Sequence, residues 1–422
     1  MATMFLGNWK WSLIVMFVMP IAGATPRSAE MPELSGPGSL PVGTDYREWL
    51  NGDRKIGVRL WYPAEPNSTT PTAVYKHQRA LQGQRALDLE ERGLAREKSV
   101  PKSNARFPLV LMSHGYGGWA EHMSQLGETL ASRGYIVCSI DHRDLPFHDA
   151  TSFALSFGSV LINRAADQET VLKAIRDHAI FDRPLTDQID LDSIALLGFS
   201  MGGYGSLITA GVPLDRGAPA YAQFPPFARA MLPDPDPALG KRIKAVVALA
   251  PWGGQPGAMV WSDTALATLN APLLLIDGDQ DDVVDFKRGV ERLFQAVRGT
   301  ERYLLVYREA AHNIAGNPIS VPDDAEFPTI EFITDPVWRK ERIQAINEHF
   351  ISAFLDLYLK GDANKRKYLE MPTPYANDGQ WPSVFGQQWG GLRAGDSQPG
   401  YWRGFQRRWA RGLELRYKAA GQ

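Results

Sequence analysis

The chain has 422 residues, which is enough for one large domain or two ordinary ones. Hydrophobic residues make up 44% and charged residues 22%, a composition that excludes a disordered chain and is normal for a globular protein. The formal net charge of −2 gives no reason to expect a nucleic-acid partner. The single cysteine, Cys138, excludes an intramolecular disulfide, and its place inside an apolar run predicts a buried strand residue rather than a reactive thiol.

The first 24 residues are typical of a signal peptide. Lys10 is the only charge ahead of the apolar run Trp11–Met19, and the small residues Ala22–Ala24 suit cleavage before Thr25. The run is shorter than the about 20 apolar residues of a transmembrane helix. An uncleaved membrane anchor and a misplaced start are the alternatives. We therefore expect a secreted or periplasmic protein, without lipid attachment because no cysteine follows the signal.

A Pro-, Gly- and Ser-rich linker is expected at 25–45, and apolar runs then alternate with segments of helical periodicity. The runs typical of strands are Val58–Tyr62, Leu109–Ser113, Tyr135–Ile140, Ile194–Gly198, Ala245–Leu249, Leu273–Ile276 and Tyr303–Tyr307. The segments with helical spacing are Met123–Arg133, Ala165–His178, Phe286–Val297 and Arg339–Leu359. This alternation predicts an α/β fold in one domain over 46–360, with a mostly parallel central sheet covered by helices on both faces.

Three segments interrupt this alternation. The insertion 64–106 contains a charged stretch, Arg79–Lys98, for which we expect a helix. The insertion 211–240 is rich in Pro and Ala, and a lid over a site is one possible role for it. The C-terminal extension 361–422 is rich in Trp and Arg. We expect its tryptophans to pack on the domain, and contact with a membrane surface, a polymer or a glycan is the alternative.

The sequence Gly198-Phe-Ser-Met-Gly202 matches the G-x-S-x-G motif of a nucleophilic serine. The motif follows the buried strand 194–198 and precedes a Gly-rich helix start, which is the strand–turn–helix context that the motif requires. Such a turn is sharp and strained, so its neighbours need to be glycines. We therefore expect Ser200 to be a nucleophile; the alternative is a Gly-rich turn with an inert serine.

A serine hydroxyl needs a base, and the order expected after such a turn is serine, acid, histidine. His312 and His349 are the histidines that follow both Ser200 and a cluster of aspartates. His349 lies in an amphipathic helix, so we expect His312 to be the base.

The acid is chosen from the aspartates that crowd the loop after 273–276, namely Asp277, Asp279, Asp281, Asp282 and Asp285. One carboxylate must accept the Nδ1–H of the histidine, which fixes its tautomer. The spacing Gly278-x-x-Asp281-x-Val-Val favours Asp281, with Asp282 as the alternative. We expect the other aspartates to be solvated or to cap backbone groups. No spaced ligand loop supports a calcium site.

An oxyanion hole needs two backbone N–H donors directed at the developing negative charge. The residue after the nucleophile, Met201, is expected to supply one of them. Tyr116, in the loop His114–Gly118 that follows an earlier strand, is expected to supply the other. His114 is expected to brace this loop rather than to transfer protons.

These motifs resemble the α/β-hydrolase superfamily over about 107–320. Within it they resemble the dienelactone hydrolase-like group, with its platelet-activating-factor acetylhydrolase-like and cutinase-like polyester-hydrolysing members. Gly115-Tyr116, Ser200–Gly203 and Pro251-Trp252 are similar to the cutinase-like motifs. The resemblance implies that Tyr116 and Trp252 flank the acyl part of a substrate; a packing role is the alternative for Trp252.

The chain also departs from these groups. His114 stands where polyester hydrolases usually carry proline, and Ser200 stands where true dienelactone hydrolases carry cysteine. The stretch Asp141–Asp144 is similar to the acetylhydrolase-like members. It either orients a polar end of the substrate or forms a salt bridge within its loop.

The chemistry expected from these residues is hydrolysis of a small or polymeric carboxylic ester through an acyl-enzyme intermediate. Ser200 attacks, His312 transfers the proton, and Asp281 orients His312. Neither a metal nor an organic cofactor is implied. The alternatives are a peptidase or amidase with the same residues, and a non-catalytic binding protein on the same scaffold.

Overall fold

The computed structural model describes residues 32–66, 69–79, 87–103, 105–321, 324–380, 400, 402–406 and 408–422. The expected signal peptide at 1–24 lies outside these residues. Within the described residues, none of the helices combines the length and the apolar composition needed to cross a membrane.

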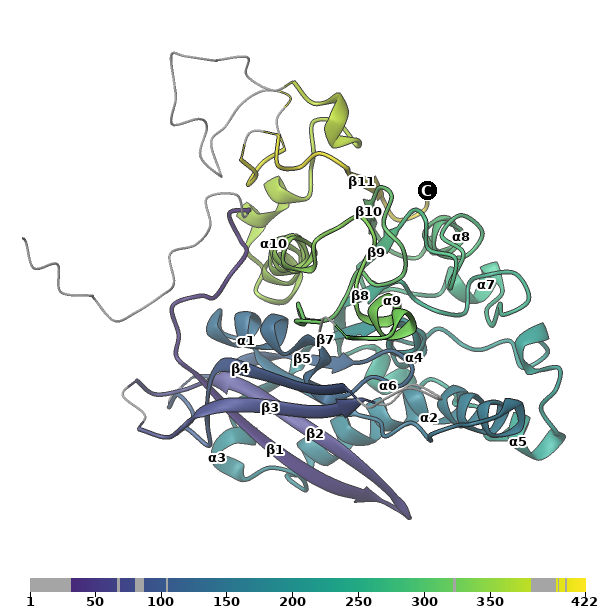
Figure 1. Ribbon diagram of the computed structural model, residues 1–422, viewed down its shortest axis with the longest axis horizontal. Coiled ribbons are helices and arrows are strands. Elements are labelled where there is room, and N and C mark those ends of the chain that lie inside the picture. The colour runs from purple at the N-terminus through teal and green to yellow at the C-terminus, as the bar shows by residue number, and fades with distance from the viewer. Residues whose placement is uncertain are drawn as a thin grey trace, which may run out of the picture.

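The described strands form one eleven-stranded sheet in the order β11-β10-β9-β8-β7-β5-β6-β2-β1-β4-β3 (Figure 1). The strands are β1 (Val42–Asn51), β2 (Arg54–Pro63), β3 (Thr72–Arg79), β4 (Leu87–Glu97), β5 (Phe107–Ser113), β6 (Ile136–Asp141), β7 (Ile189–Phe199), β8 (Ile243–Leu249), β9 (Leu273–Gly278), β10 (Arg302–Tyr307) and β11 (Leu413–Lys418). From β6 to β10 every neighbouring pair in the sheet is parallel. The mostly parallel sheet expected from the sequence is therefore confirmed.

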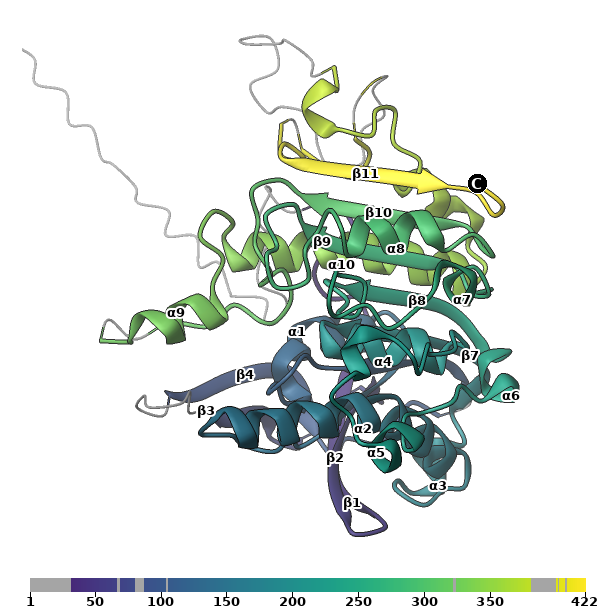
Figure 2. The same ribbon diagram turned by 90° about the vertical axis from the view of Figure 1, so that its right-hand side faces the viewer.

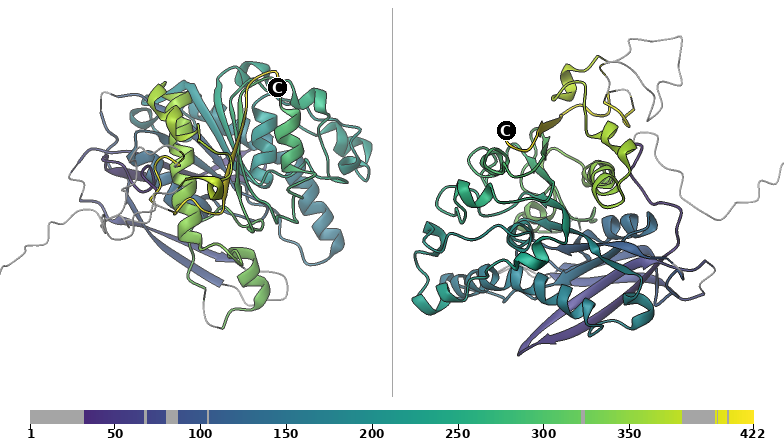
Figure 3. Two further views of the ribbon diagram at one scale, coloured as in Figure 1. Left: turned by 90° about the horizontal axis from the view of Figure 1, so that it is seen from above. Right: turned by 180° about the vertical axis from the view of Figure 1, so that it is seen from behind.

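Helices cover both faces of this sheet, and α10 and α8 lie on opposite sides of it when the molecule is seen from above (Figure 3, left). The α-helices are α1 (Ser124–Ser132), α2 (Ala150–Arg176), α3 (Arg183–Thr186), α4 (Met201–Thr209), α5 (Pro226–Ala230), α6 (Pro237–Gly240), α7 (Asp263–Leu266), α8 (Val290–Ala296), α9 (Phe327–Ile333) and α10 (Lys340–Leu359). The short 3-10 helices are η1 (Ala120–Met123), η2 (Pro219–Tyr221), η3 (Ala363–Tyr368) and η4 (Ala376–Asp378). Two covered faces explain why β9 and β10 are buried along their whole length and mostly apolar.

The helix α2 is longer than its apolar spacing predicts. It begins at Ala150 rather than at 165, because Asp149 and Ser152 form a capping box in which the Asp149 carboxylate accepts the Ser152 N–H at 2.7 Å. The first turns of α2 carry aromatic side chains, and Phe153 is 42% exposed. Because these first turns are exposed, they lack the buried apolar face by which a helix is recognised in a sequence.

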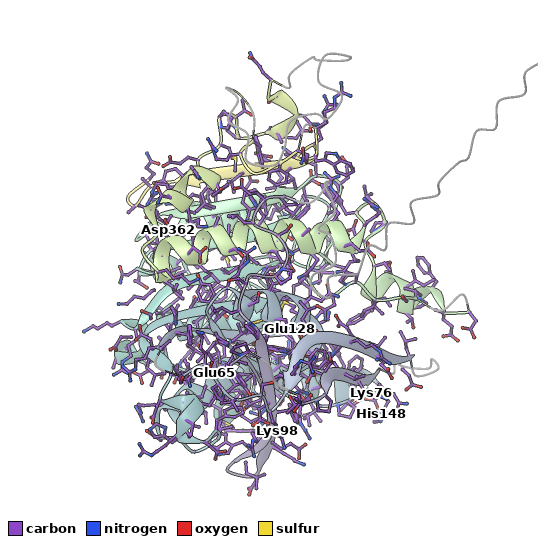
Figure 4. The ribbon with its side chains drawn as sticks, turned by 90° about the vertical axis from the view of Figure 1, so that its left-hand side faces the viewer. Glu65, Lys76, Lys98, Glu128, His148 and Asp362 are labelled. Carbon is purple, nitrogen blue, oxygen red and sulfur yellow. The ribbon has the colours of Figure 1, made fainter. Side chains whose placement is uncertain are left out.

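The expected helix at Arg79–Lys98 is wrong. The segment lies in an antiparallel hairpin of β3 and β4, whose residues 80–86 are outside the described part of the chain. Side chains of β4 alternate between more and less buried positions, the period of a strand rather than of a helix. Glu128 of α1, labelled in Figure 4, fixes the hairpin: its carboxylate accepts the Tyr75 O–H at 2.5 Å and the Leu94 N–H at 2.6 Å.

Both flanking segments contribute to the domain. The sheet begins at Val42, within the stretch expected to be a linker, and Leu34 donates its N–H to His349 Nδ1 at 3.1 Å. At the other end, β11 pairs antiparallel with β10 and forms one edge of the sheet (Figure 2). Trp402 is buried, in agreement with the expected packing of the C-terminal tryptophans.

The insertion 211–240 packs on helix α4. The Tyr221 hydroxyl lies 3.2 Å from that of Tyr204, and both side chains are buried. Phe227 and Met231 of the same insertion are exposed. A lid role for this segment stays a prediction.

Candidate active site

Ser200 occupies the one-residue turn between β7, which ends at Phe199, and α4, which begins at Met201. Its backbone has φ 52° and ψ −113°, a strained combination for a residue with a side chain. The turn is fixed on the neighbouring strand β8, because Ser200 donates its N–H to the carbonyl of Leu249 at 2.9 Å. The chain therefore keeps an unfavourable conformation that presents the serine at the end of the parallel strands.

The two motif glycines are required by the tightness of this turn. A Cβ on Gly198 would lie 2.2 Å from the backbone of Gly202, and one on Gly202 would lie 2.0 Å from the carbonyl oxygen of Ser113. Both contacts are with backbone, which cannot move aside. The G-x-S-x-G spacing is thus a packing requirement where β7, β5 and α4 meet.

His312 Nδ1 lies 2.6 Å from Asp281 Oδ2. The other oxygen of Asp281 accepts the N–H groups of Val283 at 2.8 Å and Val284 at 3.0 Å, which fixes the carboxylate. Burial alone would raise the pKa of Asp281, but these bonds and His312 hold it below its usual value. Asp282 is exposed. The pairing of His312 is therefore with Asp281.

The His312 loop sits against the serine turn and is held by two charged residues. The ring of His312 lies 5.1 Å from that of Phe199, the residue before Ser200. Asp335 accepts the N–H of Ala311 at 2.8 Å. The buried Lys340 donates to the carbonyls of Asn313, at 2.9 Å, and Ala315. Burial lowers the pKa of Lys340 to about 8, so it still carries its charge at neutral pH.

Asp277 differs from the solvated or capping role expected for the remaining aspartates. It is fully buried, its Oδ1 accepts the Gly278 N–H at 2.9 Å, and its Oδ2 is enclosed without a donor. Burial, and then the neighbouring Asp281 carboxylate, raises the pKa of Asp277 well above its usual value. Both effects favour the protonated form of Asp277, and the interaction of the two carboxyl groups lowers the pKa of Asp281 in return. In the sequence, the feature that indicates a buried carboxyl group is the position of Asp277 directly after the apolar run 273–276.

Tyr116 and Gly117 lie in the loop after β5, and this loop is anchored through α2. The Tyr116 hydroxyl donates to Ser156 at 2.7 Å, and Gly117 donates its N–H to Asp144 at 2.8 Å. The same carboxylate oxygen accepts from the buried Arg164 at 2.8 Å. Burial opposes ionisation of Asp144, yet Arg164 lowers its pKa to about 2. Asp144 is thus a fixed anion beneath the loop, in the salt-bridge role that the sequence left open.

His114 braces the same loop, as expected. Its Nε2 accepts the N–H of His142 at 3.1 Å, so its Nδ1 carries the proton and donates to the carbonyl of Gly115 at 2.6 Å. Burial, followed by the charge of Arg164, holds the pKa of His114 well below its usual value. His142 in turn lies 2.9 Å from Asp167. These histidines are neutral and structural.

An aromatic cluster borders one side of Ser200. It consists of Tyr116, Phe147, Phe153, Phe157 and Trp252. The ring of Trp252 lies 5.3 Å from that of Phe157. The backbone N–H of Trp252 donates to the carbonyl of Ser200 at 3.2 Å. Phe147 and Phe153 are more than a third exposed, so the cluster forms an apolar wall that opens to solvent. Trp252 thus both packs and borders the serine.

A solved structure shares this architecture. The chain is similar to a ferulic acid esterase from Streptomyces cinnamoneus, with a TM-score of 0.54 and 23% identity over 78% of this chain and 94% of that one. The chain has the α/β-hydrolase fold. The predicted fold class is confirmed by this likeness and by the sheet order.

Sequence comparisons find partial matches to acetylhydrolases and cutinases. A family model for platelet-activating factor acetylhydrolase, isoform II, matches residues 24–154, which end before Ser200. Cutinase est1 of Thermobifida alba is 23% identical over 215 residues, 50% of this chain and 55% of that one. Platelet-activating factor acetylhydrolase of Bos taurus is 30% identical over 139 residues, 24% of this chain and 31% of that one. The chain thus spans about half, or less, of the length of these relatives, and the resemblance read from its motifs is confirmed.

Proposed function

We propose that the protein is a serine hydrolase of carboxylic esters, with Ser200 as nucleophile, His312 as general base and Asp281 as the acid that orients His312. The observation that carries this proposal is the 2.6 Å contact between His312 and Asp281, in a loop packed against the strained turn of Ser200. Serine, base and acid each follow the end of a parallel strand. Ligands of α/β proteins bind beside the carboxyl ends of the parallel strands, which is where these three residues lie.

The proposed reaction has two halves. His312 takes the hydroxyl proton as Ser200 Oγ attacks the ester carbonyl, and the ionised Asp281 stabilises the imidazolium that forms. The N–H groups of Met201 and Tyr116 hold the oxyanion. His312 then gives the proton to the departing alcohol, and a water activated by His312 releases the acid from Ser200.

The names of the relatives support an ester as the substrate, either a small molecule or a polymer. The aromatic cluster supports an acyl group that is at least partly apolar, since Tyr116 and Trp252 border the serine on that side. Secretion or a periplasmic location is part of the proposal and rests on the N-terminal segment alone.

Covalent labelling combined with matched substrates tests this proposal. A fluorophosphonate should modify the peptide that contains Ser200, detected by mass spectrometry, and Ser200→Ala should remove the label. Purified protein should hydrolyse p-nitrophenyl esters faster than p-nitroanilides of the same acids. Label on another residue, or a preference for the anilides, would overturn the proposal.

A further inference from the structure

A cavity of about 360 Å³ lies between the β3–β4 hairpin and the loops that follow β5 and His312. Its volume is within the range of small-molecule sites. We call it the hairpin cavity; the described residues that line it are Tyr75, Lys76, His77, Asp88, Leu89, Glu90, Glu91, Trp119, Glu121, His122, Asn317, Pro318, Ile319 and Ser320. The hairpin and α9 project on the same side of the molecule in Figure 2, and Lys76 marks the hairpin in Figure 4.

The hairpin cavity shares its walls with both loops of the active site. Trp119 directly follows the Tyr116 loop, and 317–320 continue the His312 loop. The ring of His122 lies 6.0 Å from that of Phe199, which lies 5.1 Å from that of His312. His122 in the cavity wall and His312 thus contact the same ring, that of Phe199, whereas the aromatic cluster of Tyr116 and Trp252 contains none of these three rings.

This arrangement distinguishes the two parts of an ester. The histidine that takes the serine proton returns it to the departing alcohol, so the alcohol oxygen must face His312. The acyl part then extends away from His312, toward Tyr116 and Trp252. An alcohol that leaves past His312 reaches the hairpin cavity.

The charges that line the hairpin cavity disfavour an anionic ligand. Glu91 and Glu121 place carboxylates in this wall, whereas Asp88, Glu90 and Lys76 alternate with Glu91 and His77 along their strands, and Lys76 pairs with Glu90 at 3.0 Å on the other face. Glu121 is paired with Arg59 at 2.9 Å. A phosphate in this cavity would be repelled, whereas hydroxyl groups could donate to the carboxylates.

Glu91 and Asn317 are a fixed pair of polar groups in the cavity wall. The Glu91 carboxylate accepts from Asn317 Nδ2 at 2.6 Å and from Gln125 Nε2 at 2.7 Å. Asn317 Nδ2 also donates to Ser124 at 2.8 Å. The carboxylate of Glu91 is therefore held in one orientation before a ligand arrives, which lowers the entropy cost of binding.

A stacked pair of rings completes the wall. His77 of β3 and Trp119 lie parallel, with centroids 4.2 Å apart and an interplanar angle of 8°. The flat aromatic face can pack against the C–H groups of a ring, while nearby carboxylates bind its hydroxyls. Fixed acceptors beside an aromatic plane suit a compact group that is apolar on one face and hydroxylated at its edge.

We propose that the hairpin cavity binds the alcohol part of the ester and that this alcohol is an uncharged, hydroxyl-rich ring, such as a sugar or a cyclic polyol. The expected effect on ester hydrolysis rests on the proposed function, whereas binding of the alcohol in the hairpin cavity does not. The hairpin lies outside the parallel part of the sheet and is fixed on α1 by Glu128, so the wall that it contributes is held in place.

Selectivity among alcohols tests the proposal in the full-length protein. With one acyl group held constant, kcat/KM is measured for a glucose ester, a methyl ester, a choline ester and a glycerol phosphate ester. The glucose ester should exceed the methyl ester by about tenfold, as expected for one or two added hydrogen bonds. His77→Ala and Glu91→Gln should each lower this ratio about fivefold or more. Arg92→Gln, next to Glu91 on the opposite face of β4, should leave the ratio unchanged.

Equal rates for the glucose and methyl esters would overturn the proposal, and so would a preference for the choline or phosphate ester. Binding of methyl glucoside to the Ser200→Ala protein is then measured by saturation-transfer NMR. Saturable binding that His77→Ala weakens supports the cavity even if the protein hydrolyses no ester, in which case only the proposed function fails. Absence of saturable binding in a folded Ser200→Ala protein, checked by circular dichroism, overturns the cavity assignment.

Discussion

The carboxyl groups of Asp277 and Asp281 lie beside each other, and their interaction raises the pKa of Asp277 and lowers that of Asp281. Asp281 contacts His312 and backbone N–H groups, which favour its charge, and Asp277 is fully buried, which disfavours a charge. We therefore expect a neutral Asp277 to donate to an ionised Asp281 and to help hold the orientation of the Asp281 carboxylate.

Replacing Asp277 should change the pH dependence of stability. In the pH range above about 4, the folded protein holds a proton on Asp277 that the unfolded chain releases, so the free energy of unfolding falls as pH rises. Asp277→Asn keeps a donor and has no such proton. The free energy of unfolding of this variant, relative to that of the unaltered protein, should therefore increase between pH 5 and pH 8 by at most about 1.4 kcal/mol for each pH unit, and its relative Tm should rise accordingly. A Tm difference that is constant with pH would contradict a protonated Asp277.

The same pair predicts an effect on catalysis. Asp277→Ala removes the donor to Asp281, and kcat/KM for a p-nitrophenyl ester should fall about tenfold, the effect of one lost hydrogen bond. Asp277→Asn is the matched control and should retain most of the activity. Equal losses in both variants would argue against the donor role.

Asp281 and Asp282 should differ sharply when each is changed to asparagine. Asp281→Asn leaves His312 with the wrong tautomer, and kcat should fall by about four orders of magnitude. Asp282 is exposed, so Asp282→Asn should leave kcat within about twofold. Steady-state kinetics on one ester compare the two. A larger loss in Asp282→Asn would show that the acid has been misassigned.

Arg164 should be essential for stability and for the Tyr116 loop. Its guanidinium is buried and pairs with Asp144, which also accepts the Gly117 N–H. Arg164→Met leaves Asp144 buried and unpaired, at a cost of about 3–5 kcal/mol in the free energy of unfolding. Arg176→Met, which removes an exposed pair with Asp177, should cost less than about 1 kcal/mol. Urea unfolding measures both, and similar losses would refute the anchoring role.

Trp252→Ala separates substrate contact from packing. If Trp252 borders the acyl group, kcat/KM should fall about tenfold more for an ester of a bulky aromatic acid than for an acetate ester. An equal fall for the two esters, together with a lower Tm, would mean that Trp252 acts by packing against Tyr204 and Phe157.

The parallel core was predictable because its strands are continuous apolar runs and its turns carry a recognisable glycine motif. The hairpin was not predictable, because β4 carries charged residues on both faces. Its alternation of burial arises only from the packing of one face on α1. The strand β11 escaped prediction for a similar reason, because its partner β10 lies far away in the sequence.

The residues of the site were predictable where chain order constrains them. Ser200, Asp281 and His312 follow from a motif and from the order of strand ends, and the contact between His312 and Asp281 agrees with that order. The supports of the site depend on tertiary contacts instead. Arg164, Lys340 and Glu91 each meet partners that no local pattern connects to them.

The central claim concerns Ser200, and one comparison tests it most directly. Hydrolysis of p-nitrophenyl butyrate is measured for the unaltered protein and for Ser200→Ala, with circular dichroism and Tm as checks of folding. The variant should be folded, and its kcat should be lower by about five orders of magnitude or more. A folded Ser200→Ala protein that retained the activity would contradict the account.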